Sequence, residues 1–142
     1  MNLERAIEIA VEAHKGVLDK GGNPYVLHPL RMMFAVKTEE EKIVAVLHDV
    51  IEDAIGWEFR RLEKEGFSAA VIDALRSVTK ITEDEDYDAF IERAMSNPIG
   101  KQVKIADIRD NLDVTRIIEL TEKDMTRLNK YKKALARLTG TR

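Results

Sequence analysis

The stretch that decides the fold is Ile43-Val44-Ala45-Val46-Leu47, which is followed directly by His48 and Asp49. Five apolar residues without a polar break predict a helix that is buried on all sides and lies at the centre of a helical bundle. Upstream, Thr38 and Glu41 have the spacing of a capping box, which predicts the start of this helix. The polar His-Asp pair would then be held by the most buried element of the chain.

Helical spacing of apolar residues extends over almost the whole chain. Leu3, Ile7, Ala10, His14 and Val17 recur at three- and four-residue steps, and His14 reads as a satisfied, partly buried histidine of this stripe. Prolines and glycines are few and scattered, so we predict an all-α, compact single domain over residues 1–142. Further helices are predicted at Pro24–Phe34 and near residues 57–64, 68–78, 87–95, 99–112 and 121–138.

The composition narrows the classes of function. The chain has 142 residues, a net charge of −3 and no cysteine. The charge gives no basic signature, so we expect no nucleic-acid partner. The lack of cysteine excludes thiolate metal sites and cysteine nucleophiles and fits a cytoplasmic location. No apolar run is long enough to span a bilayer, so we expect no membrane partner. A homo-oligomer is compatible with the sequence but is not indicated by it.

Two histidines and two aspartates have the right chemistry for a divalent metal site: His28, His48, Asp49 and Asp107. An adjacent His-Asp pair is a weak signal by itself, because a helix can simply end in solvated polar groups. His28 alone would more often be a structural histidine under a turn, and sequence does not show that it meets His48. The apolar residues around Asp107 indicate burial, and a buried aspartate needs a partner such as a metal.

Other polar residues accompany these candidates. Glu52 and Asp53 lie four residues after His48 and Asp49 on the same predicted helix, where a carboxylate can accept a proton from water. Asn111 lies four residues after Asp107, and Lys104 lies one turn before it. The alternative for this segment is a solvent-facing Lys-Asp pair of little energetic consequence.

These clusters, in this order, resemble the HD superfamily of metal-dependent phosphohydrolases. Within it they are most similar to the hydrolase domain of RelA/SpoT homologues, in particular the small alarmone hydrolases. The resemblance spans most of the chain, and the joint pattern is specific although each piece alone is not. The matching pieces are Ala10 with His14, Lys20 through Pro29, Leu47 through Asp53, Val78 through Lys80, and Lys104 through Asn111.

The resemblance implies an all-helical HD-domain fold that binds a single Mn²⁺ and removes the 3′-pyrophosphate from ppGpp or pppGpp, a small nucleotide. It implies that Glu52 and Asp53 orient and activate the attacking water. It implies four metal ligands, which are His28, His48, Asp49 and Asp107. We expect the substrate pocket to involve four further residues: Lys20, Lys104, Asn111 and Tyr131, with simple packing as an equal alternative for Tyr131.

The chain departs from the family pattern where the base would bind. The family usually has Arg directly before the Lys that matches Lys20, where it helps hold guanine, and this chain has Asp19. Val114 stands where Thr is common, and residues 107–111 read Asp-Ile-Arg-Asp-Asn rather than Asp-Arg-Leu-His-Asn. We therefore expect a weak preference for guanine. Two alternatives stay open: hydrolysis of another nucleotide or phosphoester, and a metal-containing binding or regulatory module without turnover.

Overall fold

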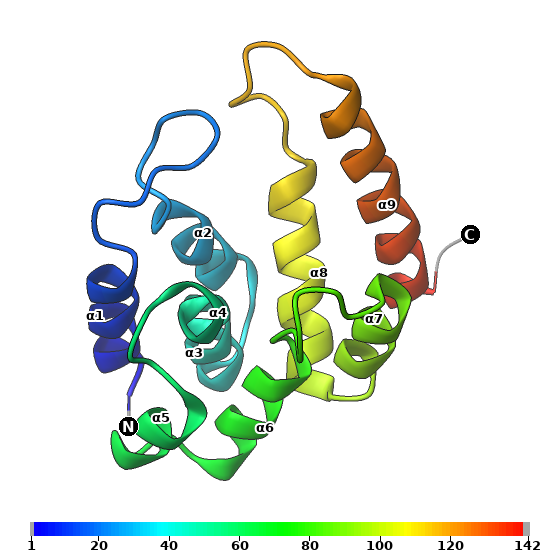
Figure 1. Cartoon of the computed structure of the whole chain (residues 1–142). Coiled ribbons are helices and arrows are strands. Elements are labelled where there is room, and N and C mark those ends of the chain that lie inside the picture. Colours follow the sequence, from blue (N-terminus) through cyan, green and yellow to red (C-terminus); the bar gives the residue numbers. More distant parts are fainter. Residues whose placement is uncertain (1, 141–142) are drawn as a thin grey trace.

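A computed structural model describes residues 2–140, and within this range the chain forms nine α-helices (Figure 1). The helices are α1 (Leu3–Ala13), α2 (Leu27–Ala35), α3 (Glu39–Leu47), α4 (Val50–Asp53), α5 (Phe59–Lys64), α6 (Ala69–Ser77), α7 (Tyr87–Met95), α8 (Pro98–Leu112) and α9 (Glu122–Thr139). The described residues contain no strand, and a single isolated bridge joins Leu18 to Pro24. The predicted all-α fold is confirmed.

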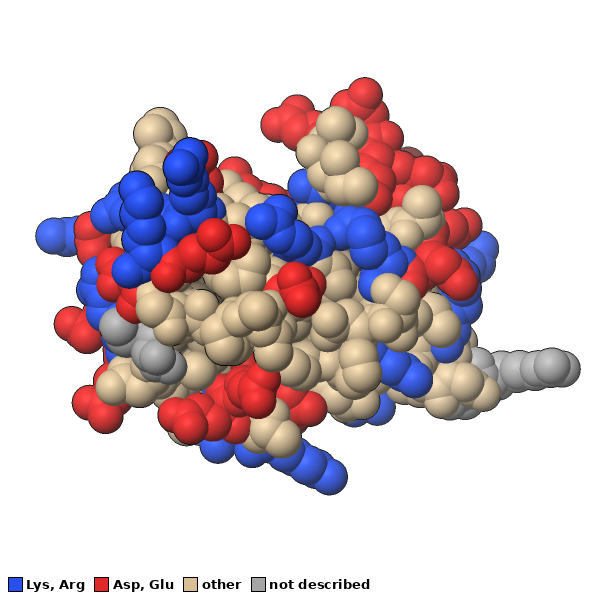
Figure 2. Space-filling view, turned by 90° about the horizontal axis from the view of Figure 1, so that it is seen from below, with Lys and Arg blue, Asp and Glu red and all other residues tan. Residues whose placement is uncertain are grey.

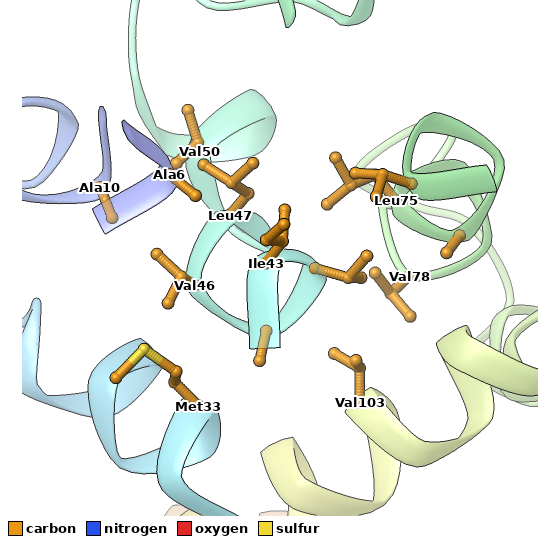
Figure 3. Close-up of a cluster of buried hydrophobic side chains, with 14 of the residues drawn as sticks. Ala6, Ala10, Met33, Ile43, Val46, Leu47, Val50, Leu75, Val78 and Val103 are labelled. Carbon is orange, nitrogen blue, oxygen red and sulfur yellow. The ribbon is translucent and has the colours of Figure 1, made fainter. Parts of the chain in front are cut away.

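Helix α3 lies at the centre of the bundle, as its apolar stretch predicts. All five residues from Ile43 to Leu47 are buried, and α1, α2, α6 and α8 pack against this helix. In Figure 3 Val46 lies near Ala10 and Met33, whereas Val103 approaches α3 from the opposite side. Burial of each such side chain contributes roughly 1.5–3 kcal/mol, so α3 is anchored from several directions.

The predicted capping box is present at the start of α3. Glu41 N donates to Thr38 Oγ1 at 3.1 Å, and Thr38 N donates to Glu41 Oε1 at the same distance. Two otherwise unpaired backbone donors are thereby satisfied, which sets the first residue of the central helix.

The first two helices have different bounds from those predicted. Helix α1 ends at Ala13, because Gly16 adopts a φ of 80° that turns the chain away. Val17 is consequently 48% exposed and does not belong to the apolar stripe. Helix α2 begins at Leu27 rather than at Pro24, since the preceding residues form a loop in which Tyr25 N donates to Val17 O at 2.8 Å.

The continuous helix predicted through His48 and Glu52 is also wrong. Helix α3 ends at Leu47, and His48 and Asp49 form a turn before α4 begins at Val50. The amide of His48 bonds to the carbonyl of Ala45, three residues back, which tightens the end of α3. In this turn the side chains of His48 and Asp49 point toward the same region, as they would not in a regular helix.

Helices α8 and α9 lie side by side on the other flank of the bundle (Figure 1). A second, smaller core joins them to α7 and contains Ile91, Ile105, Ile108, Ala134 and Leu138. Helix α8 also packs directly on α3, so its polar residues are held against the end of the central helix.

Charged side chains of both signs share the face seen in Figure 2, and neither sign covers it. Within residues 2–140, no helix combines the length and apolar character needed to cross a membrane.

We expect Gly100→Ala to destabilise the protein, although Gly→Ala inside a helix normally stabilises by about 0.5–1 kcal/mol. A Cβ at Gly100 would lie far inside contact distance of Ser77 Oγ and 3.2 Å from Ser77 Cβ, where α8 meets α6. Overpacking of this kind costs roughly 1–3 kcal/mol. Urea denaturation gives the free energy of unfolding, and the matched double variant Gly100→Ala/Ser77→Ala should recover part of the loss. A more stable Gly100→Ala protein would contradict this close packing.

Candidate active site

The structure brings the four predicted metal ligands together from three separate elements. His28 lies in the first turn of α2, His48 and Asp49 form the turn after α3, and Asp107 lies in α8. One potential ligand atom from each of His28, His48 and Asp49 lies within 4.8 Å of the other two. Asp107 Oδ1 is 3.0 Å from His28 Nε2 and 3.8 Å from His48 Nε2. His28, His48 and Asp49 are close enough to share one cation, because metal–ligand distances are about 2 Å, and Asp107 adjoins this group beside the two histidines.

His48 is aimed at this cluster by the backbone of α3. Its Nδ1 lies 2.8 Å from the carbonyl oxygen of Ala45, so Nδ1 carries the proton and donates. Its Nε2 is buried and has no hydrogen-bond partner among residues 2–140, although Asp49 Oδ2 lies 3.0 Å away. Burial would lower the pKa of His48, but the charge of Asp49 beside it raises it. A cation that displaces the proton from Nε2 would meet an imidazole whose orientation is already fixed, which fits the role of metal ligand.

Asp107 is the buried carboxylate at the centre of the site. Lys104 Nζ donates to its Oδ2 and Asn111 Nδ2 to its Oδ1, each at 2.9 Å. Burial alone would raise the pKa of Asp107, but the charge of Lys104 and the hydrogen bond from His28 hold it well below its usual range. Asp107 is therefore ionised, as a metal ligand must be.

Asp49 is ionised for a similar reason. Burial would raise the pKa of Asp49, but the adjacent charge of His48 lowers it to about 2. The hydroxyl of Tyr25 donates to Asp49 Oδ2, which fixes the orientation of the carboxylate. Tyr25 was not predicted as a site residue, although it lies within the Lys20–Pro29 segment that matches the family pattern.

The two acids of α4 occupy different places. Glu52 lines the same pocket as the metal candidates, and its Oε1 accepts a hydrogen bond from Lys80 N at 2.6 Å. Burial raises the pKa of Glu52 above its usual value. Asp53 lines only a neighbouring cavity of about 520 Å³, which Glu52 also borders, and burial raises the pKa of Asp53 to about 6. The structure thus brings Glu52, but not Asp53, into the pocket.

A pocket of about 270 Å³ opens over the four candidate ligands. Three lysines line it, Lys80, Lys104 and Lys130, together with Tyr87 and Phe90 of α7. Lys104 Nζ lies 4.5 Å from the ring centroid of Phe90. Three ammonium groups beside a metal-binding cluster favour a ligand with several phosphate charges.

A second pocket, of about 340 Å³, adjoins the first and shares Tyr25, His28, Asn111 and Tyr131 with it. It contains Lys20, Asn111 and Tyr131, three of the four predicted substrate residues; Lys104 lies in the first pocket. Lys20 Nζ is held 3.3 Å from Asp124 Oδ1. The two pockets together have room for a phosphate group at the metal and a nucleoside beside it.

His14 is not the satisfied, partly buried histidine that the sequence indicated. Its side chain is buried, and its Nε2 has no hydrogen-bond partner among the described residues. Its ring centroid lies 5.0 Å from that of Tyr25 in an edge-on arrangement. Burial lowers the pKa of His14, so the imidazole is neutral and packs behind the tyrosine that holds Asp49.

Comparison with known proteins relates the chain to one group of relatives. A scan against protein-family models finds no match. The chain is 31% identical over 121 residues to the guanosine-3′,5′-bis(diphosphate) 3′-pyrophosphohydrolase of Aquifex aeolicus and 33% identical over 101 residues to that of Borreliella burgdorferi. These alignments cover 78% and 68% of this chain but 17% and 14% of the relatives, so the chain spans less than a fifth of their length.

A solved structure shares the fold over nearly the whole chain. It belongs to a metazoan orthologue of SpoT that hydrolyses ppGpp and plays a role in starvation responses. The TM-score is 0.80 at 25% sequence identity, and the match covers 98% of this chain and 86% of that one. The fold and these relatives together define a helical domain of the HD type. Within that class, the chain belongs to the RelA/SpoT-type hydrolase domains.

We expect the stability of the protein prepared without metal to fall as pH rises from about 6.5 to about 9. Burial would lower the pKa of His28, but its hydrogen bonds to Asp107 and Asp110 raise it from 6.5 to about 9. A group whose pKa is higher in the folded state than in the unfolded state stabilises the fold. This stabilisation is complete at a pH below the unfolded-state pKa, and it is lost as the pH rises through the folded-state pKa. The contribution is on the order of 3 kcal/mol.

The measurement is the free energy of unfolding against pH in the presence of a chelator. His28→Gln is the control, because it removes the titrating group and should flatten the curve in this window. Parallel curves for the two proteins would contradict the raised pKa.

Proposed function

We propose that the chain is a metal-dependent phosphohydrolase that removes the 3′-pyrophosphate from ppGpp or a closely related nucleotide. One observation carries this proposal: two histidines and two ionised aspartates converge beneath a pocket lined by three lysines. The names of the relatives support the choice of ppGpp, since they describe hydrolysis of its 3′-pyrophosphate.

The metal would be held by His28, His48, Asp49 and Asp107. Nε2 of His48 supports this donor set, because it is buried, has no hydrogen-bond partner among residues 2–140 and would offer its lone pair once an ion displaces its proton. A divalent cation bound there polarises a phosphoryl oxygen and acidifies water. Imidazole and carboxylate ligands suit Mn²⁺, which we propose as the ion on the strength of the family resemblance.

The side chains around the metal site would perform the remaining tasks. Lys80, Lys104 and Lys130 neutralise the phosphate charges in the first pocket. Glu52 accepts the proton of the attacking water, and its raised pKa brings it closer to the pH at which a general base works best. Asn111 and Tyr131, which line both pockets, bind the sugar and the base at their junction.

The reaction is a simple displacement by water. The water oxygen bonds to the phosphorus attached to ribose O3′, and the bond from that phosphorus to O3′ breaks. O3′ takes up a proton and leaves as the ribose hydroxyl, and the other product is pyrophosphate. We propose a cytoplasmic enzyme that acts on this small nucleotide and binds neither nucleic acid nor membrane.

Hydrolysis of a different nucleotide is the second candidate, and Asp19 is the observation that favours it. Asp19 Oδ1 accepts hydrogen bonds from Gly21 N and Asn23 N, both at 2.9 Å. This carboxylate oxygen therefore holds its own loop together. A guanidinium at this position would stack on a purine, whereas Asp19 offers no such contact.

The decisive experiment measures pyrophosphate release from ppGpp, ppApp and simple nucleotides with purified protein and Mn²⁺. We expect release that is abolished by a chelator and by His48→Ala. A protein that binds Mn²⁺ but releases no product from any of these nucleotides would instead be a binding or regulatory module.

We expect Glu52→Gln to lower turnover by roughly 10²–10⁴-fold while Mn²⁺ stays bound, because the change removes the proton acceptor at nearly constant size. Asp53→Asn is the matched control. It should cost less, since Asp53 faces the neighbouring cavity. The measurements are turnover under saturating substrate and Mn²⁺ content. Wild-type turnover in Glu52→Gln would show that another group takes the proton.

We expect ppGpp and ppApp to be hydrolysed with similar catalytic efficiency. Asp19→Arg should increase the ratio in favour of ppGpp if its guanidinium reaches the base. Asp19→Asn is the control, because it keeps an oxygen that can accept from the loop amides but adds no stacking group. A strong guanine preference in the wild type that Asp19→Arg leaves unchanged would mean that this position does not read the base.

A further inference from the structure

Asp110 is a carboxylate that the sequence did not single out and that the site described so far does not use. It lies in α8 directly before Asn111, and its side chain is 13% exposed. Three basic side chains converge on it, His28 and Arg31 from α2 and Arg116 from the segment after α8. His28 and Arg31 both form hydrogen bonds with this carboxylate.

The first connection runs from Asp110 to the metal site. Asp110 Oδ2 lies 2.6 Å from Nδ1 of His28, and the other nitrogen of this ring, Nε2, faces Asp107. An anionic acceptor at Nδ1 keeps the proton on that nitrogen and leaves the lone pair of Nε2 for a metal. His28 lacks the backbone acceptor that fixes His48, so Asp110 does for His28 what the carbonyl of Ala45 does for His48.

The second connection runs from Asp110 to the second pocket. Arg31 forms a two-pronged contact, with Nε 2.8 Å from Oδ1 and Nη2 3.0 Å from Oδ2. Arg31 and Arg116 both line this pocket, and Arg116 also donates to the backbone carbonyl of Asp110 at 3.0 Å. Nη1 of Arg31 makes no hydrogen bond to the part of the chain that is described, so one edge of the guanidinium is free for an anionic ligand.

We propose that Asp110 is a positioning residue that holds His28 in the tautomer needed for metal binding and, through Arg31, holds the wall of the second pocket at a fixed place relative to the metal. This inference rests on the metal site of the proposed function. In this proposal one carboxylate aligns both ends of the substrate. One end is the phosphate at the metal, and the other is the part that binds beside Arg31.

A purely structural ion pair is the competing explanation, and it makes different predictions. If Asp110 only stabilised the fold through Arg31, removing either partner would have similar consequences, and metal affinity would follow stability. If Asp110 positions His28, its loss should weaken metal binding in a way that loss of Arg31 does not.

The test compares Asp110→Ala, Asp110→Asn and Arg31→Ala in the full chain. Isothermal titration with Mn²⁺ gives the metal affinity, which requires no turnover, and kinetics with ppGpp gives kcat and KM separately. We expect Asp110→Ala to weaken Mn²⁺ binding by roughly 10–100-fold. Asp110→Asn keeps an oxygen that can accept from His28 Nδ1, so it should restore part of the affinity. Arg31→Ala should raise KM and leave Mn²⁺ affinity close to that of the wild type.

Asp113→Asn is the matched control for Mn²⁺ affinity. Asp113 lines the same pocket and pairs with Arg116, but within residues 2–140 no hydrogen bond or ion pair joins it to His28. The proposal is overturned if Asp110→Ala binds Mn²⁺ as the wild type does, or if Arg31→Ala or Asp113→Asn loses as much affinity as Asp110→Ala. If Asp110→Ala does not fold, the other two variants decide. The proposal is then overturned if Asp110→Asn has the Mn²⁺ affinity and KM of the wild type while Arg31→Ala loses Mn²⁺ affinity.

The same data separate this proposal from the proposed function. A wild-type protein that binds Mn²⁺ but hydrolyses no nucleotide would contradict the proposed function, while the Mn²⁺ affinities of the variants would still decide the role of Asp110. A wild-type protein that binds no Mn²⁺ would overturn both.

Discussion

The buried carboxylate of Asp107 is the constraint around which the rest of the structure is arranged. A charge in the interior is tolerated only when hydrogen bonds and opposite charges replace its lost hydration. Lys104, Asn111 and His28 supply these from the same helix and from α2. Because Lys104 is itself buried, neither member of the pair can be removed alone without leaving an uncompensated charge. The packing of α8 on α2 and α3 therefore depends on the same polar contacts that position Asp107 in the site.

The break between α3 and α4 is the second feature on which the site depends. Adjacent residues of a regular helix point about 100° apart, so two neighbours cannot both approach one ion. The turn at His48 and Asp49 removes this restriction and brings His48 Nε2 to 3.0 Å from Asp49 Oδ2. The buried part of α3 acts as the rigid support, because its five apolar residues are packed on several sides.

Local charge, rather than net charge, sets what the two pockets can bind. The chain carries a net charge of −3, yet three lysines surround the first pocket, and the second contains Lys20 and three arginines, Arg31, Arg116 and Arg127. Carboxylates hold several of these cations in place, among them Asp110 and Asp124. Preorganised cations of this kind stabilise phosphate without the cost of ordering flexible side chains during binding.

The sequence by itself determined the helical fold, the central position of α3 and the residue types of the metal site, because apolar periodicity, the capping box at Thr38 and the His and Asp motifs are local signals. It did not determine the turn at His48 and Asp49 or the loop before Leu27, since backbone bonds there depend on how neighbouring helices pack. It also did not reveal the role of Asp110, because two of its partners, His28 and Arg31, lie 82 and 79 residues away in the chain. Only the tertiary structure decided that Glu52 faces the pocket and Asp53 does not, because helix α4 is too short for periodicity to show its orientation.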